Sequence, residues 1–149
     1  MKRRIELLAA VALVALIAAS ATLGASGTTT TLRSGTSSLG RIVVDGQGRT
    51  LYLFEKDRNR RSACYGACAI YWPPLLTHGR PIARGGLRQS LVGTTRRKNG
   101  TLQVTYAGHP LYRYVGDSGR GQTNGAGLTD YGGGWDPLSP AGKKIEAGD

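Results

Sequence analysis

An internal duplication is the feature that most constrains this chain. Seven positions of one segment reappear in order when 60 is added to the residue number. The first set is Ile42, Val44, Gly48, Leu51, Tyr52, Phe54 and Asp57, and the second is Leu102, Val104, Gly108, Leu111, Tyr112, Tyr114 and Asp117. The segments that begin at Trp72 and Trp135 also match, at a spacing of 63, so the second copy carries three extra residues. Two copies are too few for a solenoid. We therefore expect them to pack as a pseudo-symmetric pair around one core.

Each copy begins with the sequence pattern of a β-hairpin. In the first copy, residues 42–45 and 50–55 are rich in β-branched, aromatic and Leu side chains, and the turn Gly46-Gln47-Gly48 separates them. In the second copy, residues 102–106 alternate between apolar and polar side chains, and a turn leads from there into residues 111–115. Both copies therefore predict paired strands.

A further hairpin is expected between the two copies. Residues 91–97 and 101–106 flank Asn99-Gly100, which is the strongest short hairpin signal in the chain. No window beyond the N-terminal segment keeps a helical apolar period. The sequence therefore predicts an all-β fold, one small domain built from two pseudo-symmetric, hairpin-containing repeats and preceded by a signal helix. We expect a single folded domain over residues 39–145, with a first repeat at 39–97 and a second at 98–149.

The N-terminal segment has the pattern of an export signal. A basic start at Lys2-Arg3-Arg4 precedes an uncharged apolar run over residues 7–19 and a small-x-small site that ends at Ala21. Residues 1–21 are therefore predicted to be a signal peptide; the alternative is an uncleaved anchor, which would be the only attachment to a membrane. Residues 22–38 consist mostly of Thr, Ser and Gly and predict a flexible tether. The domain is expected to work outside the cytoplasm.

The chain is strongly basic, with a formal net charge of +11 at pH 7. Removal of residues 1–21, which carry three basic side chains and one acidic side chain, leaves +9. Such a charge attracts anionic surfaces over long range. Outside the cell, these are lipid headgroups and wall polymers of the envelope rather than nucleic acid. The basic residues are scattered along the sequence and do not outline one groove, so solubility alone is the simpler interpretation. They include Arg58, Arg60, Arg61, Arg84, Arg88, Arg96, Arg97 and Lys98.

Cys64 and Cys68 are the only cysteines of the chain. Two thiols in an oxidising compartment normally form a disulfide, and this one would hold a short turn. A zinc site would need two further ligands, but the only histidines, His78 and His109, lack the close spacing of zinc ligands. The sequence therefore predicts a disulfide with no metal and no cofactor. A redox-active or metal-binding cysteine pair remains the alternative.

The repeated motif is Tyr-x-aromatic-x-x-Asp. Its members are Tyr52, Phe54 and Asp57 in the first copy and Tyr112, Tyr114 and Asp117 in the second. Residues two apart on a strand share a face, so each copy places two rings side by side. An Asp just after a strand can accept hydrogen bonds from backbone N–H groups and fix a turn. One interpretation is aromatic packing with an Asp turn lock; the other is a shallow aromatic pocket edged by a carboxylate, suited to a sugar, a planar ring or a cation.

Trp72 and Trp135 occupy equivalent places in the two copies, each close before a proline. We expect both to fill the core rather than to contact a ligand. Together with the repeated motif, this pattern resembles the bacterial secreted-repeat lipoprotein family, whose hallmark is Tyr-x-[Phe/Trp/Tyr]-x-x-Asp in tandem. The likeness includes the cysteine and tryptophan segment at 64–75 and covers roughly residues 39–140. The resemblance implies extracytoplasmic placement and repeat organisation, and no reaction. The chain lacks a lipidation Cys after its signal segment, so lipid attachment is not predicted.

Three functions are compatible with these patterns. The first is a non-enzymatic binding or structural module of the envelope, because no Ser, Thr or Cys sits in a recognisable pattern with a base and an orienting group. The second is an envelope redox or cofactor protein that uses Cys64 and Cys68 or the aromatic cluster. The third is an enzyme of wall glycans, in which Asp57 and Asp117 would face each other as a carboxylate pair.

Overall fold

The structure of this chain is a computed structural model that describes residues 27–148. The predicted signal segment, residues 1–21, lies outside these residues. Within them, ten strands form three small sheets, joined by one short α-helix and one 3-10 turn. The prediction of an all-β fold is therefore confirmed, with the helix α1 (Ala67–Tyr71) as a local addition.

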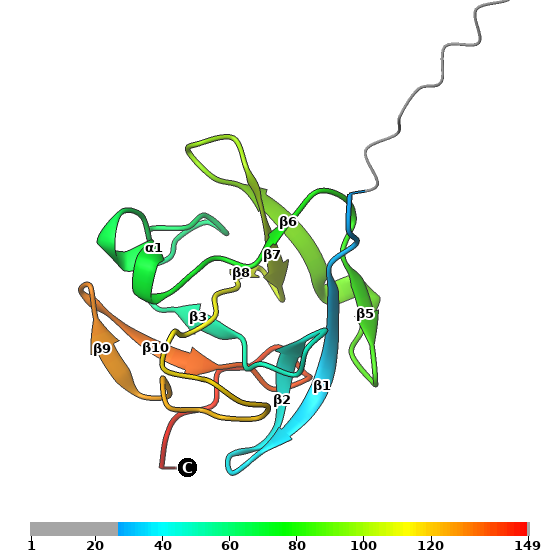
Figure 1. The fold of residues 1–149 in the computed structure, drawn as a ribbon, viewed down its shortest axis with the longest axis vertical. Helices are drawn as coiled ribbons and strands as arrows, with labels where there is room; N and C mark the ends of the chain where they lie inside the picture. Colours follow the sequence, from blue (N-terminus) through cyan, green and yellow to red (C-terminus); the bar gives the residue numbers. More distant parts are fainter. Residues whose placement is uncertain (1–26, 149) are drawn as a thin grey trace, which may run out of the picture.

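The three sheets surround a common interior (Figure 1). The first sheet has the order β2-β1-β5, with β1 (Thr31–Ser37), β2 (Gly40–Asp45) and β5 (Ile82–Arg84). The second has the order β3-β10-β9, with β3 (Tyr52–Phe54), β10 (Gly133–Pro137) and β9 (Leu128–Asp130). The third has the order β4-β7-β6, with β4 (Leu76–Thr77), β7 (Leu102–Tyr106) and β6 (Val92–Arg96). Strand β8 (His109–Pro110) also pairs with β7, and the 3-10 turn η1 (Gln89–Leu91) precedes β6.

The tether predicted for residues 22–38 is wrong over its second half. Strand β1 pairs antiparallel with β2 along its length, from Leu32 opposite Asp45 to Ser37 opposite Gly40. Its Thr and Ser residues resemble a linker in composition, but β-branched Thr suits a strand, and Leu32 is fully buried. The folded domain therefore starts near residue 31 and not at residue 39.

The hairpin β1–β2 in the first repeat corresponds to the hairpin β6–β7 in the second. Each is antiparallel, and each leads through a turn into the repeated motif of its copy, which forms strand β3 in the first repeat and only isolated bridges at Tyr112 in the second. The first repeat therefore begins at β1 and the second at β6, which moves the predicted start of the second repeat from residue 98 to about residue 92. The hairpin predicted across Asn99-Gly100 is confirmed, with Gly100 at a φ of 85°.

The hairpin predicted for residues 42–45 and 50–55 forms only next to its turn. Val44 and Thr50 make an isolated bridge, and β3 then leaves β2 to pair with β10. The turn is held by the Asp45 side chain and is one residue longer than the turn of the second repeat. As a result, the Leu51 N–H donates to the carbonyl of Val43 at 3.1 Å, and the Leu111 N–H donates to the carbonyl of Val104 at 3.0 Å. Val43, and not Val44, is the structural counterpart of Val104.

The core has an aliphatic part and an aromatic part, and both repeats contribute to each. The aliphatic cluster contains Leu32, Val43, Leu51, Leu53, Leu75, Val104, Tyr106, Leu111 and Leu138. The aromatic cluster contains Tyr52, Phe54, Cys64, Cys68, Trp72, Tyr112 and Trp135. Since neither repeat supplies a whole cluster, the two copies share one interior, as the duplication predicts.

Candidate functional site

The two motif tyrosines meet at the pseudo-twofold axis between the repeats. The backbone N–H of Tyr52 donates to the carbonyl of Tyr112 at 2.9 Å, and the N–H of Tyr112 donates back to the carbonyl of Tyr52 at 3.0 Å. Both side chains are fully buried. A residue that is identical in the two copies therefore lies at the contact between them.

The tyrosine hydroxyls cross from one repeat to the other. The Tyr52 hydroxyl donates to Oδ2 of Asp117 at 2.5 Å, and the Tyr112 hydroxyl donates to Oδ2 of Asp57 at 2.8 Å. Each motif carboxylate thus belongs to one repeat and binds the tyrosine of the other. The sequence shows that these residues recur at equal spacing, but it does not show that their partners are exchanged.

The second oxygen of each carboxylate holds its own loop. Oδ1 of Asp57 accepts the N–H of Ala63 at 2.7 Å, and Oδ1 of Asp117 accepts the N–H of Asn124 at 2.9 Å. This is the turn-locking role that a post-strand Asp indicates. Each aspartate therefore joins a loop of one repeat to a tyrosine of the other.

Burial controls the protonation of these groups. Desolvation raises the pKa of Asp57 to about 6, although the Ala63 N–H and the Tyr112 hydroxyl act in the opposite direction. Desolvation also raises the pKa of Asp117. The pKa values of both tyrosines are raised as well, by burial and by their neighbouring carboxylates, so the hydroxyls remain hydrogen-bond donors.

Four aromatic rings stack in a column through the centre of the molecule. Phe54 lies 4.0 Å from Trp135, Trp135 lies 4.0 Å from Trp72, and Trp72 lies 4.4 Å from Tyr114, measured between ring centroids. Successive rings of the column come from alternate repeats, and the two tryptophans form its middle contact. The motif tyrosines meet the tryptophans edge-on at 5.3 and 5.1 Å. These are the two favoured geometries of aromatic pairs.

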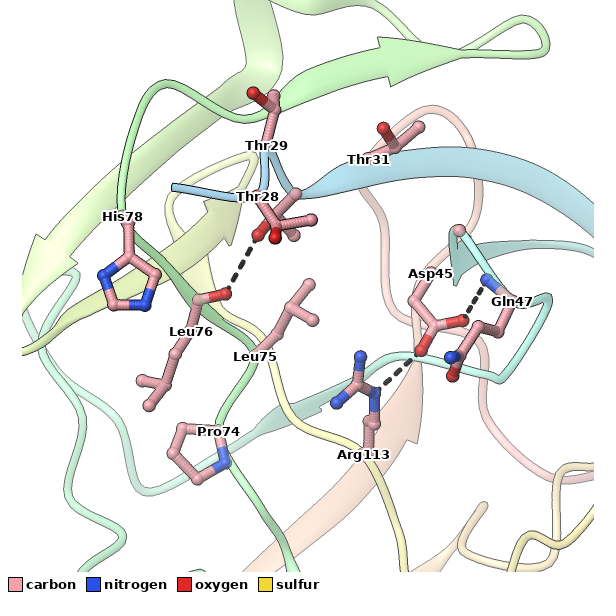
Figure 2. A pocket seen from close by; sticks show the side chains of 12 residues that line it. Thr28, Thr29, Thr31, Asp45, Gln47, Pro74, Leu75, Leu76, His78 and Arg113 are labelled. Atoms are coloured by element: carbon pink, nitrogen blue, oxygen red, sulfur yellow. Dashed lines mark hydrogen bonds and ion pairs between the residues drawn. The ribbon is translucent and has the colours of Figure 1, made fainter. Parts of the chain in front are cut away.

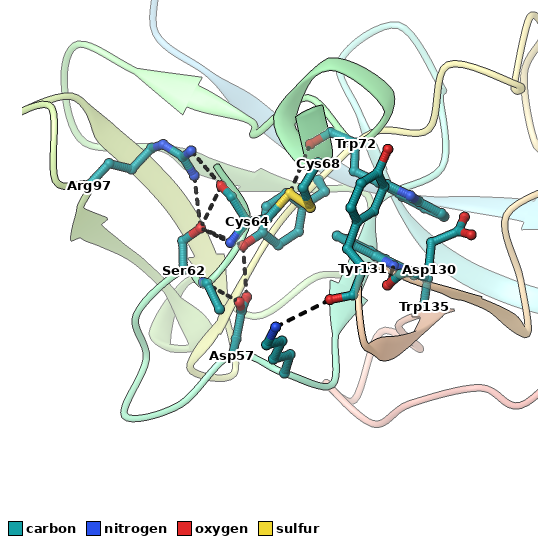
Figure 3. The surroundings of a disulfide bond; sticks show 12 residues. Asp57, Ser62, Cys64, Cys68, Trp72, Arg97, Asp130, Tyr131 and Trp135 are labelled. Carbon is teal, nitrogen blue, oxygen red and sulfur yellow. Dashed lines mark hydrogen bonds between the residues drawn. A yellow bond between two sulfur atoms is a disulfide. The ribbon is translucent and has the colours of Figure 1, made fainter. Parts of the chain in front are cut away.

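The disulfide lies beside this column (Figure 3). Cys64 and Cys68 are bonded, with their Cα atoms 5.3 Å apart, as the sequence predicts. The bond closes the start of α1, and the helix ends where the Trp72 N–H donates to the carbonyl of Cys68 at 2.8 Å. The disulfide loop therefore delivers Trp72 to the stack.

Arg97 is a buried cation that the sequence groups with surface residues. Its Nη1 donates to Oγ of Ser62 at 2.9 Å and to Oε1 of Gln103 at 2.7 Å, and its Nη2 donates to the carbonyl of Cys64 at 2.8 Å. The Tyr112 hydroxyl also lies 2.8 Å from Oγ of Ser62. Figure 3 shows Arg97 reaching toward Ser62 and the disulfide loop. The arginine is thereby connected to the crossed Tyr–Asp pairs.

Four of the eight basic residues named above line one hollow, which the sequence did not predict. A depression of about 370 Å³ lies between the 61–65 loop and the tip of the β6–β7 hairpin. It is lined by Arg61, Ser62, Tyr65, Thr95, Arg96, Arg97 and Lys98. We call it the basic hollow. Arg61 lies 35 residues before the basic run at 96–98, so only the fold brings it beside that run.

A second depression, of about 500 Å³, lies where β1 begins (Figure 2). Asp45 and Arg113 face each other at 2.7 Å on its border and join the two repeats. Burial alone would raise the pKa of Asp45, but hydrogen bonds from the Arg49 N–H and the Arg113 side chain, with the charge of Arg113, hold it below its usual value. His78 also lines this depression.

The other histidine lies elsewhere. His109 lines a third depression together with Asp57, and burial lowers the pKa of this histidine. Among residues 27–148, no three His, Cys, Asp or Glu side chains gather in the manner of a metal site.

These features define a class of protein: an all-β domain in which two tandem repeats exchange Tyr–Asp hydrogen bonds across a shared aromatic core. Residues 34–76 and 93–139 match the sequence model of a family described as a secreted repeat of unknown function. The chain belongs to this family, and its domain is extracytoplasmic. The two matches begin within β1 and β6, in agreement with the repeat boundaries of the structure. No curated protein and no solved structure matches the chain. None of the helices in the described part of the chain is both long and apolar enough to cross a membrane.

Proposed function

We propose that this protein is a non-enzymatic module of the bacterial envelope that binds anionic polymers or lipid headgroups through its basic surface. One observation carries the proposal: the tyrosines and aspartates of the repeated motif bind one another inside the fold. Both tyrosines are fully buried, and each donates to the aspartate of the opposite repeat. The motif thus builds the domain, and the surface remains to meet the partner.

The positions of the carboxylates support a structural role over glycan hydrolysis. A glycosidase needs two carboxyl groups that flank the scissile bond, one of which donates a proton to it. Here each carboxylate already accepts a tyrosine hydroxyl and a backbone N–H. The ring faces of Trp72 and Trp135 are likewise covered by other rings.

The surroundings of the disulfide support a structural role as well. Redox-active cysteines are partly exposed, with a thiolate stabilised by nearby positive charge. Cys64 is fully buried, Cys68 is 5% exposed, and both pack within the aromatic cluster. The guanidinium of Arg97 donates to the backbone carbonyl of Cys64 rather than to its sulfur, so this contact serves the loop.

The experiment measures binding and turnover on the same samples. We expect the protein to sediment with phosphatidylglycerol vesicles, or with isolated cell walls, at about 50 mM salt and to be released at about 500 mM, since salt screens surface attraction. Tyr52→Phe should lower stability and leave binding unchanged. Failure to bind either material at low salt would overturn the proposal. The proposal would also be overturned if the protein hydrolysed wall glycan and the Asp57→Asn variant remained folded but lost this activity.

A further inference from the structure

We propose that the basic hollow is a binding site for a phosphate group, of the kind that lipid headgroups and polyol-phosphate polymers share. This inference rests on the proposed function and gives it a place and a ligand chemistry. Four cations line the hollow, together with the hydroxyls of Ser62, Tyr65 and Thr95. No carboxylate is among its lining residues in the described part of the chain.

Arg97 is the strongest single indication of an anionic ligand. The residue is 5% exposed, and its three hydrogen bonds go to neutral acceptors, namely a hydroxyl, an amide oxygen and a backbone carbonyl. None of the ion pairs formed within residues 27–148 includes it. The charge of Arg97 acts on the Asp57 carboxyl and lowers its pKa, but hydrogen bonds connect the two groups only through the Tyr112 hydroxyl and Ser62. A buried cation without a direct counter-ion is unfavourable, and a bound anion would remove that penalty.

Three of the four cations of the hollow are held in place before any ligand arrives. The guanidinium carbon of Arg97 lies 4.4 Å from the ring centroid of Tyr65, and Nζ of Lys98 lies 5.0 Å from the same centroid. The Lys98 N–H donates to the Tyr65 hydroxyl at 3.1 Å, and Nη1 of Arg96 donates to the carbonyl of Gly100 at 2.8 Å. Because less side-chain freedom is lost on binding, such a fixed site binds more tightly than mobile surface cations.

The donor set favours phosphate as the ligand. A guanidinium presents planar pairs of N–H groups that match two phosphate oxygens, and an ammonium adds a point charge. The Ser62 hydroxyl already donates to the carbonyl of Cys64, so the hydroxyls of Tyr65 and Thr95 are the ones that can donate to the remaining oxygens. At about 370 Å³, the hollow has room for a phosphate together with part of the carbon group that carries it. The hollow opens at the surface, so the remainder of a polymer or lipid can stay outside.

The test uses one variant in the hollow and one matched control. Arg61→Gln/Lys98→Gln removes two exposed cations from the hollow, and Arg84→Gln/Arg88→Gln removes two exposed cations that lie outside it. Both variants therefore lose the same charge. Glycerol phosphate and inorganic phosphate are titrated into each protein at constant ionic strength, with thermal stability and NMR shifts as readouts. We expect at least a tenfold weaker affinity in the hollow variant and less than a twofold change in the control.

Two further arms identify the source of the phosphate. Phosphatidylglycerol vesicles and a soluble poly(glycerol phosphate) are offered at equal phosphate concentration, with free glycerol phosphate as the competitor. If free glycerol phosphate displaces the protein from the vesicles or from the polymer, the site is supported, and the material from which it is displaced is the source of the phosphate. Equal weakening in both variants, or no titration by phosphate, overturns the site. If the wild type and both variants bind vesicles equally well, the hollow is not the binding site, but the proposed function stands. If the wild type binds no anionic material, both proposals fail.

Discussion

The two repeats hold the same motif by different means. In the first, the loop from Asp57 to Trp72 is cross-linked by the disulfide and contains α1. In the second, the loop from Asp117 to Trp135 is three residues longer and folds as β9 against β10, with the Gly127 N–H donating to the carbonyl of Trp135 at 2.9 Å. The fold therefore requires that a tryptophan reach the stack, and either a covalent bond or a strand pairing can deliver it.

The tryptophans themselves differ in one hydrogen bond. Nε1 of Trp135 donates to the carbonyl of Asp130 at 3.2 Å. Nε1 of Trp72 is buried, and within residues 27–148 no acceptor lies within hydrogen-bond reach of it. The first repeat thus combines a covalent link with an unpaired N–H group, and the second combines hydrogen bonds with a longer chain.

The largest effect is expected from removal of a central ring. Trp72→Ala and Trp135→Ala should each lower the free energy of unfolding by about 3–5 kcal/mol, because each opens a cavity at the middle of the stack. Urea denaturation of both variants measures this. A loss below about 1 kcal/mol in either variant would show that one repeat alone supports the core.

The pH dependence of stability should report on the Asp57 carboxyl group. The pKa of Asp57 in the folded protein, about 6, lies above the ordinary aspartate value of 3.8. Its contribution to stability is therefore full below about pH 4 and is lost as the pH rises through 6, a change of up to about 3 kcal/mol. Asp57→Asn should flatten the stability profile over this window, measured by denaturation at several pH values relative to the wild type. An unchanged slope would contradict the assignment.

Reduction should distinguish the repeats chemically. Cys64→Ser/Cys68→Ser should cost about 2 kcal/mol, the amount expected for a cross-link that closes so short a loop. A reducing agent should lower the stability of the wild type and leave this variant unchanged. Denaturation with and without dithiothreitol provides the measurement. Equal sensitivity of both proteins to the reagent would argue against a stabilising disulfide.

The smallest expected effect tests the tryptophan N–H groups. Trp135→Phe should cost about 1 kcal/mol more than Trp72→Phe, because only Trp135 loses a hydrogen bond in addition to ring area. The two variants are compared by urea denaturation under one condition. Equal losses would place an acceptor, such as a bound water, near Nε1 of Trp72.

Much of the fold follows from local sequence patterns. Spacing alone identifies the two repeats, the turn residues Asn99-Gly100 identify a hairpin, and the export context identifies the disulfide. These features depend on residues close in sequence or on simple repetition. Strand β1 was not predicted, because its only large apolar anchor is Leu32 and its pairing is made by the backbone.

The candidate site depends on contacts between distant residues, which a pattern does not encode. A period of two places Tyr52 and Phe54 on one face, but it does not reveal that the hydroxyl of Tyr52 reaches Asp117 in the other repeat. Arg97 stands in a run of basic residues that resembles an exposed turn. Its burial follows from the approach of the 61–65 loop, which no local signal indicates.

The reciprocal bridge between Tyr52 and Tyr112 also bears on how such a chain arose. A single ancestral unit would have a phenol and a carboxylate without hydrogen-bond partners. Two identical units that met across a twofold axis, as in an isologous homodimer, would supply both partners at once. Joining the two genes would then have raised the effective concentration of one unit for the other and freed each to diverge. The two halves now differ in the cysteines of the first and the glycine-rich loop of the second.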